Sequence, residues 1–242
     1  MALMAALEAD LRALSAEARR RHPGIKDGAE QAISKLRSLS GPSDILHNEE
    51  IFRVFLAACD VRVVKLSVIG LSSLQKLISH DVIPPSALDE ILSILKEHGE
   101  MADEIVQLKT LQTILIIFQS SLLPTTEESL SRALHVCLRL LENSKSSDNV
   151  INTAAATFRQ AVALIFDQVI RSETLPTGKI GYGGYLSRTS SITSDVNRSI
   201  NQSESLEQEA VSGSFLSLRG IKTDSGKLGI YVLEDLTALC AG

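Results

Sequence analysis

Histidine, cysteine and arginine are the residues of this chain whose chemistry could serve catalysis, metal binding or anion recognition. The histidines are His22, His47, His80, His98 and His135, and the cysteines are Cys59, Cys137 and Cys240. No histidine and cysteine share the short spacing of a metal site. Most of the histidines fall at the ends of expected helices, where the helix dipole favours a cation. We therefore interpret them as surface or capping residues.

Motifs for catalysis and phosphate binding do not occur in the sequence. No nucleophile, base and orienting acid can be assembled, and neither a dinucleotide nor a Walker fingerprint is present. The segment Gly181-Tyr182-Gly183-Gly184 is not preceded by an expected strand or followed by Gly-Lys-Ser/Thr, so it is not a phosphate loop. We predict that the chain is not an enzyme and has no cofactor or metal.

One single arginine and one cluster of three arginines are candidate contact residues. Arg159 interrupts the apolar stretch NTAAATFRQAVALIFDQVI, residues 152–170. Its guanidinium could bind a carboxylate of a partner, or it could pair with an acid or a helix end of the adjacent repeat. Arg19, Arg20 and Arg21 could contact anionic lipid, or they could complement the C-terminal end of the first helix.

The composition excludes several classes of protein. A net charge of −5 and a pI of about 5.6 do not fit a nucleic-acid binder, which needs a concentrated excess of lysine and arginine. Three separated cysteines do not form a disulfide framework and fit a reducing, cytoplasmic setting. The longest purely apolar run after the N-terminus, residues 114–118, is far shorter than the roughly 20 residues of a membrane span, and the N-terminus lacks the form of a signal peptide. We expect a soluble protein whose membrane contact is peripheral.

Apolar residues recur at helical spacing from residue 3 to about residue 172. The expected helices are one that carries Leu3, Leu7, Leu11 and Leu14 and ends near Pro23-Gly24, one that carries Ala29, Ile33 and Leu36 and stops at Gly41-Pro42, and others over residues 49–58, 61–79, 85–99, 102–121, 126–142 and 148–172. No segment before residue 175 alternates apolar and polar residues. The pattern therefore predicts an all-α protein.

The expected helices repeat along the chain. Long, nearly all-round apolar helices are centred near positions 70, 112 and 160, and shorter amphipathic helices near 54, 92 and 134 lie between them. A spacing of about 40 to 47 residues is typical of HEAT and armadillo arrays, in which each pair buries its apolar face against its neighbours. We predict an armadillo/HEAT-like superhelix over residues 1–172. In it, the helix of residues 152–170 has other helices on most sides, and its alanines permit close approach.

The composition changes near residue 173. Residues 173–226 are rich in serine, glycine and asparagine, which predicts a disordered linker. Thr189, Ser190 and Ser191 follow an arginine there and are candidate phosphorylation sites that could dock or release the segment. Residues 227–242 favour one amphipathic helix, which could pack on the array, pair with another chain, or begin a further region.

Three stretches carry a resemblance to a known family. The segments LEADLRALSAEARRRHPGIKDGAEQAISKL, LKTLQTILIIFQS and NTAAATFRQAVALIFDQV resemble the N-terminal dimerisation and cyclophilin-binding (DCB) domain. That domain heads the large Sec-seven-type Arf guanine-nucleotide exchange factors and the related Mon-two proteins, and the similarity is closest to the Mon-two group. GKLGIYVLEDLTAL resembles the first helix of the homology-upstream-of-Sec-seven (HUS) region, so we expect the chain to be a fragment or a truncated product.

The resemblance implies a function for the chain. It implies a non-catalytic scaffold in vesicle traffic, cytoplasmic and peripheral on Golgi, trans-Golgi network and endosome membranes. The implied partners are a second copy of the chain, the downstream HUS region, an Arf-like small GTPase and a Dopey-type protein. An alternative is that the chain is a regulatory N-terminal piece of an Arf-type exchange factor and acts in cis.

Overall fold

The computed structural model describes residues 2–19 and 21–174, and every regular element in these ranges is helical. The α-helices are α1 (Ala2–Ala18), α2 (Pro23–Ser38), α3 (Glu50–Asp60), α4 (Val64–Ser79), α5 (Leu88–Gly99), α6 (Glu104–Gln119), α7 (Glu127–Glu142) and α8 (Asp148–Thr174). Two 3₁₀ turns, η1 (Pro42–His47) and η2 (Pro85–Ala87), precede α3 and α5. The prediction of an all-α fold is confirmed.

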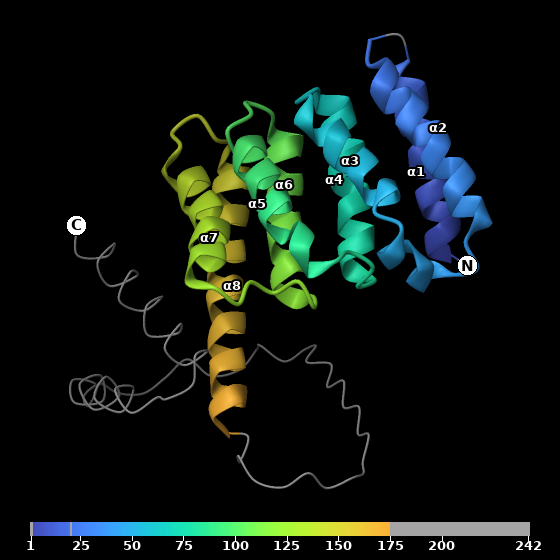
Figure 1. The fold of residues 1–242 in the computed structure, drawn as a ribbon. Coiled ribbons are helices and arrows are strands. Elements are labelled where there is room, and N and C mark those ends of the chain that lie inside the picture. Colours follow the sequence, from blue (N-terminus) through green and yellow to red (C-terminus); the bar gives the residue numbers. More distant parts are fainter. Residues whose placement is uncertain (1, 20, 175–242) are drawn as a thin grey trace, which may run out of the picture.

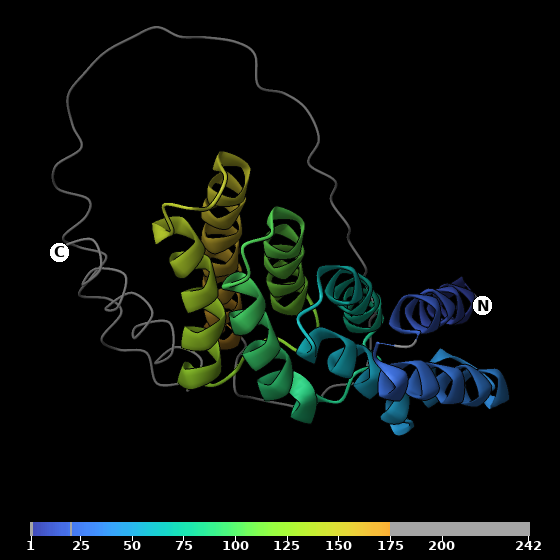
Figure 2. The same cartoon turned by 90° about the horizontal axis from the view of Figure 1, so that it is seen from above.

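The helices form two layers of a repeat array (Figure 1). One layer holds α1, α4, α6 and α8 in that order, and the other holds α2, α3, α5 and α7. The view from above shows the two rows side by side (Figure 2). The pairs α3/α4, α5/α6 and α7/α8 each place one short amphipathic helix against one long apolar helix. This is the alternation that the sequence predicts for helical repeats.

The helix ends follow local sequence signals. Pro23 begins α2, and Pro42 and Pro85 begin the two 3₁₀ turns, because proline has a fixed φ and needs no N–H partner at a helix start. The carboxylate of Asp103 accepts a hydrogen bond from the Val106 N–H, and the Thr126 hydroxyl accepts one from the Ser129 N–H. These N-caps fix the starts of α6 and α7.

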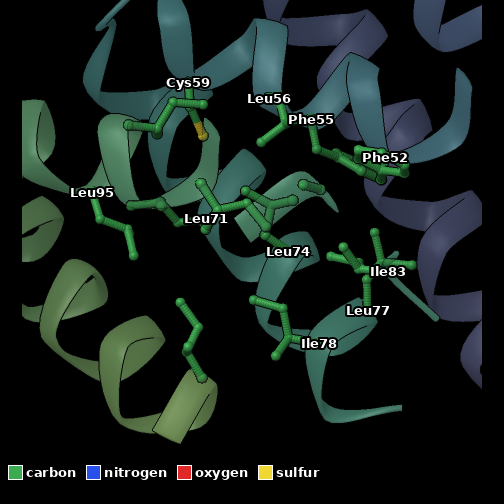
Figure 3. Packing of buried hydrophobic residues seen from close by; sticks show 14 of the residues in the cluster. Phe52, Phe55, Leu56, Cys59, Leu71, Leu74, Leu77, Ile78, Ile83 and Leu95 are labelled. Carbon is green, nitrogen blue, oxygen red and sulfur yellow. The ribbon is translucent and has the colours of Figure 1, made fainter. Parts of the chain in front are cut away.

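Leucine and isoleucine fill most of the core, and two phenylalanines lie in the part of the core between α3 and α4. Phe52 and Phe55 of α3 are fully buried, and they pack near Leu74 and Leu77 of α4 (Figure 3). The chain is only 4% aromatic, so the core relies on many aliphatic side chains. Each repeat contributes a buried face that its neighbours cover, which makes the stack continuous.

Polar contacts connect consecutive repeats between the apolar layers. Asp10 of α1 accepts a hydrogen bond from the Lys76 ammonium of α4. The amide of Gln75 donates to the Lys109 carbonyl and to the Thr113 hydroxyl of α6, over 3.1 and 3.0 Å. These bonds fix the rotation of each helix relative to the next.

Two expectations about helix position are wrong. The first helix ends at Ala18 and not near Pro23, because Arg19 adopts a left-handed φ of 33° and turns the chain. The last helix, α8, is not enclosed on most sides. It buries the face that carries Val150, Ala154 and Thr157 and, further on, Ala161 and Ile165, while Ala156 and Arg159 are exposed.

Most of the expected linker and the whole expected C-terminal helix lie outside the described residues. The expected linker spans residues 173–226 and the expected helix spans residues 227–242. Both therefore remain predictions from composition and periodicity.

Candidate partner-binding surfaces

The nucleophilic side chains of the array are buried and weakly acidic. Cys59 and Cys137 have free thiols inside the core, and burial raises the pKa of each to about 12. A thiol reacts as its thiolate, so both groups are poor nucleophiles at neutral pH. No group of three or more histidine, cysteine, aspartate or glutamate side chains within residues 2–19 and 21–174 could hold a metal ion.

His98 contradicts the interpretation of the histidines as surface residues. Its side chain is 1% exposed, at the end of α5. Its Nδ1 lies 2.8 Å from the Ile94 carbonyl oxygen and its Nε2 lies 2.9 Å from the Ser67 hydroxyl oxygen. Burial lowers the pKa of His98, because an uncompensated imidazolium loses its hydration there. The residue is a neutral structural link between α4 and α5.

The other histidines lie at or near the surface. His47, His80 and His135 are exposed, and His22 is half-buried just before α2. Nδ1 of His80 lies 2.8 Å from the Lys76 carbonyl oxygen at the end of α4. That position suits a histidine, since the helix dipole favours positive charge there.

Arg159 lies on the solvent side of α8. The residue is exposed, and it makes no ion pair with any other residue that the structure describes. The buried face of α8 lies on the opposite side, so the two alternatives, a carboxylate of a partner or an acid or helix end of the adjacent repeat, remain predictions. The exposed position leaves the guanidinium accessible to a carboxylate of another protein.

The C-terminal part of α8 extends beyond the neighbouring helices. In Figure 1 the orange helix continues past the ends of α6 and α7. Ile170 on this part is 58% exposed, and Phe166 is only half-buried. Ile105 at the start of α6 is also 58% exposed. The sequence did not indicate either isoleucine, because a helix with apolar residues on nearly all sides gives no sign of which apolar side chains are exposed.

The arginine cluster lies at the turn between α1 and α2. Arg19 and Arg21 are exposed, whereas Arg20 lies outside the described residues. Lys65 of α4, near the same end of the array, pairs with Glu17 over 3.6 Å. The structure thus leaves two cations of this turn accessible to an anionic surface.

The candidate phosphorylation sites have no structural description. Thr189, Ser190 and Ser191 lie outside residues 2–19 and 21–174.

No helix within residues 2–19 and 21–174 is both long and apolar enough to cross a membrane.

Comparison with known proteins identifies one family over the helical array. The family model that matches residues 1–173 is described as the dimerisation and cyclophilin-binding domain, DCB, of Mon2/Sec7/BIG1-like proteins. The Protein MON2 homolog of Xenopus laevis is 33% identical over 174 residues, which cover 69% of this chain and 10% of that relative. The human Protein MON2 homolog is 32% identical over 178 residues, or 71% of this chain and 10% of the relative. Protein MON2 of Saccharomyces cerevisiae is 32% identical over 163 residues, which cover 67% of this chain and 10% of that relative. The matched region is thus about a tenth of these relatives.

Proposed function

The chain belongs to the Mon2/Sec7/BIG1-like DCB domain family, and from this membership we propose that it is a non-catalytic scaffold in vesicle traffic that self-associates and binds trafficking proteins. The observation that carries the proposal is the match over residues 1–173 to a domain whose description names dimerisation. A helical-repeat array suits this role, because its stacked helices present extended surfaces.

The C-terminal part of α8, which continues past the ends of α6 and α7, is the surface that we propose for self-association. An apolar side chain such as Ile170, exposed on a helix that extends beyond its neighbours, is a common feature of protein contact sites. Arg159 lies about three turns earlier on the same helix and is available for a carboxylate of the second copy. Burial of the apolar side chain would supply most of the affinity, and the ion pair would supply orientation.

We further propose a location and partners. The domain acts on the cytoplasmic side of Golgi, trans-Golgi network and endosome membranes as a peripheral protein, with Arg19 and Arg21 toward anionic lipid. Its partners are an Arf-like small GTPase, a Dopey-type protein and the HUS region that follows the domain in longer family members. The resemblance of the sequence to this family supports these assignments.

Light scattering coupled to size exclusion tests the self-association. We expect the chain to have the mass of a dimer at micromolar concentration and Ile170→Glu to have the mass of a monomer. Gln160→Glu, which adds the same charge at another exposed position of α8, is the matched control and should remain dimeric. A monomeric mass for the unchanged chain up to about 100 μM would contradict the proposal.

A second candidate function is regulation of nucleotide exchange in cis. It is favoured by the family description, which includes Sec7-type proteins. An assay of nucleotide release from an Arf-class GTPase separates the two functions. Acceleration by this chain alone would contradict the non-catalytic role, whereas a change only when an exchange domain is present in the same polypeptide would support the second function.

A further inference from the structure

The exposed face of α3 forms a ridge with a cavity on each side. The residues of this α3 ridge are Glu50, Arg53, Ala57 and Asp60, which share one helix face. The cavity toward α2 has a volume of about 340 Å³, and the cavity toward α5 has a volume of about 300 Å³. Arg53 and Ala57 line both cavities. The two cavities therefore lie next to each other, with only Arg53 and Ala57 of α3 between them.

The cavities arise from the way in which this layer packs. α3 and α5 contact each other sparsely, whereas α4 and α6 behind them pack closely. The layer is therefore open between α3 and α5. On the other side of the ridge, Gly24 and Gly28 of α2 leave room because they have no side chains. Because Ala57 has a small side chain, it forms only a low barrier between the two cavities.

The size of the cavities indicates what could fill them. Both lie at the lower limit for small-molecule sites, which range from about 300 to 1,000 Å³ and are usually enclosed. Apolar atoms of Leu56 and Ile94 contribute to the cavity toward α5, and those of Ile25 and Val54 contribute to the other. Two small neighbouring hollows with partly apolar walls suit two side chains of one peptide better than they suit a cofactor.

Carboxylates outnumber cations around the α3 ridge. The two cavities are lined by four acidic residues, Glu50, Asp60, Glu90 and Glu97, and by one basic residue, Arg53. Arg53 already pairs with Glu49 over 2.9 Å and with Glu90 over 3.6 Å, and Arg62 pairs with Glu97 over 2.6 Å. Glu50 and Asp60 make no ion pair with any residue in the described ranges. One unpaired carboxylate therefore lies at each end of the ridge.

Asp60 is at a position that helix stability does not explain. It is the last residue of α3, where the partial negative charge of the helix end disfavours an anion. Its side chain is exposed and lines the cavity toward α5. A carboxylate that is unfavourable for its own helix, unpaired, and next to a hollow is well placed to receive a cation from another molecule.

We propose that the α3 ridge binds a basic amphipathic helix of a partner protein. The helix crosses α3 at Ala57, places one apolar side chain in each cavity, and directs lysine or arginine side chains to Asp60 and Glu50. The cavities flank one helix, so they are separated by about 10 Å, and residues seven apart on a helix are separated by about 10.5 Å. The anchors therefore sit at positions i and i+7, a pattern known for helices in grooves.

This inference deepens the proposed scaffold function and rests on it, but it uses a surface on the layer opposite to α8. Self-association and peptide binding can thus be measured separately. A result in which peptide binding fails while dimerisation persists concerns the ridge alone.

Fluorescence anisotropy with a labelled synthetic peptide tests the proposal. The probe is a peptide of about 18 residues built from lysine, leucine and alanine, with leucines at i, i+4, i+7 and i+11 so that it forms an amphipathic helix. A scrambled peptide of the same composition controls for net charge. We expect the ordered peptide to bind the full chain at least about tenfold more tightly than the scrambled one, with an affinity that falls as salt rises.

Matched variants locate the site. Ala57→Gln should place a larger side chain between the two cavities and weaken peptide binding about tenfold. Asp60→Asn should weaken peptide binding about threefold. Their controls are Ala156→Gln on the exposed face of α8 and Glu142→Gln at the last residue of α7, neither of which should change binding. Dimer mass and melting temperature should stay unchanged in all four variants. Equal binding of the ordered and scrambled peptides, no binding at all, or equal effects of the ridge variants and the controls would each overturn the proposal.

Discussion

The imidazole of His98 in α5 lies with its Nε2 2.9 Å from the hydroxyl oxygen of Ser67 in α4, inside the core between two repeats. The Ile94 carbonyl oxygen near Nδ1 can only accept a hydrogen bond, so Nδ1 carries the proton and Nε2 accepts from the Ser67 hydroxyl. This arrangement selects one neutral tautomer. Two consecutive repeats are thus joined by a side chain whose charge depends on pH.

The first prediction concerns the pH dependence of stability. Burial lowers the pKa of His98 below 6.5. The hydrogen bond to the Ile94 carbonyl and the charges of Glu97 and Asp60 partly oppose this shift, and Arg62 adds to it. Below pH 6.5 the unfolded chain therefore binds more protons at this residue than the folded chain does. The free energy of unfolding should fall as the pH decreases below 6.5, and above that value the residue should add no further dependence. Urea unfolding between pH 5 and pH 8 measures this.

A substitution isolates the contribution of His98. His98→Gln removes the titrating group, costs about 1 to 3 kcal/mol by disturbing its buried hydrogen bonds, and should flatten the decline below pH 6.5. His135→Gln removes an exposed histidine of α7 and is the control. An unchanged slope in His98→Gln would mean that other groups cause the pH dependence.

The second prediction concerns the close approach of α3 and α4 at Gly70. A Cβ atom at this position would lie 2.6 Å from Cys59 Sγ and 2.8 Å from the Phe55 carbonyl oxygen. The backbone oxygen cannot move aside cheaply, so Gly70→Ala should lower the free energy of unfolding by about 1 to 3 kcal/mol, despite the better helix propensity of alanine. Gly24→Ala, where a Cβ would meet nothing within 4 Å, should be neutral or slightly stabilising. Denaturant midpoints of the two variants provide the comparison.

Much of the fold could be predicted from the sequence, because its signals are local. Pro23, Pro42 and Pro85 mark starts of elements, and the alternation of long apolar and short amphipathic helices gives the two layers. The end of α1 could not be predicted in the same way. The left-handed turn at Arg19 has no glycine to indicate it, so the helix ends before the proline.

The candidate surfaces were harder to predict, because exposure depends on neighbours that are distant in sequence. Arg159 is exposed since α6 and α7 cover the opposite side of α8. His98 is buried since Ser67, 31 residues earlier, packs against it. The cavity between α3 and α5 depends on the sparse contact of these two helices, a property of the assembled layer that no single helix pattern contains.

The third prediction concerns the reactivity of the buried thiols. With a pKa of about 12, only on the order of one in ten thousand of the Cys59 and Cys137 thiols is ionised at pH 8. Native protein with Cys240→Ser should therefore resist iodoacetamide for hours, and two alkyl groups should be added per chain in concentrated guanidinium chloride. Intact-mass spectrometry counts the added groups. Rapid alkylation of the folded protein would show that one thiol is accessible.

The fourth prediction uses the three consecutive alanines at the start of α8. Ala154 is 0% exposed, Ala155 is half-buried and Ala156 is exposed, so only the first faces the helices that pack on α8. Ala154→Leu should overpack this contact and lower the free energy of unfolding by about 1 to 3 kcal/mol. Ala156→Leu should change it by less than about 0.5 kcal/mol, because the added atoms point to solvent. The alanines differ by two positions in one helix and receive the same substitution, so helix propensity and composition are matched. Thermal unfolding of both variants distinguishes the two positions. Equal losses would mean that α8 is rotated relative to α6 and α7, and then the exposed position of Arg159 would be wrong as well.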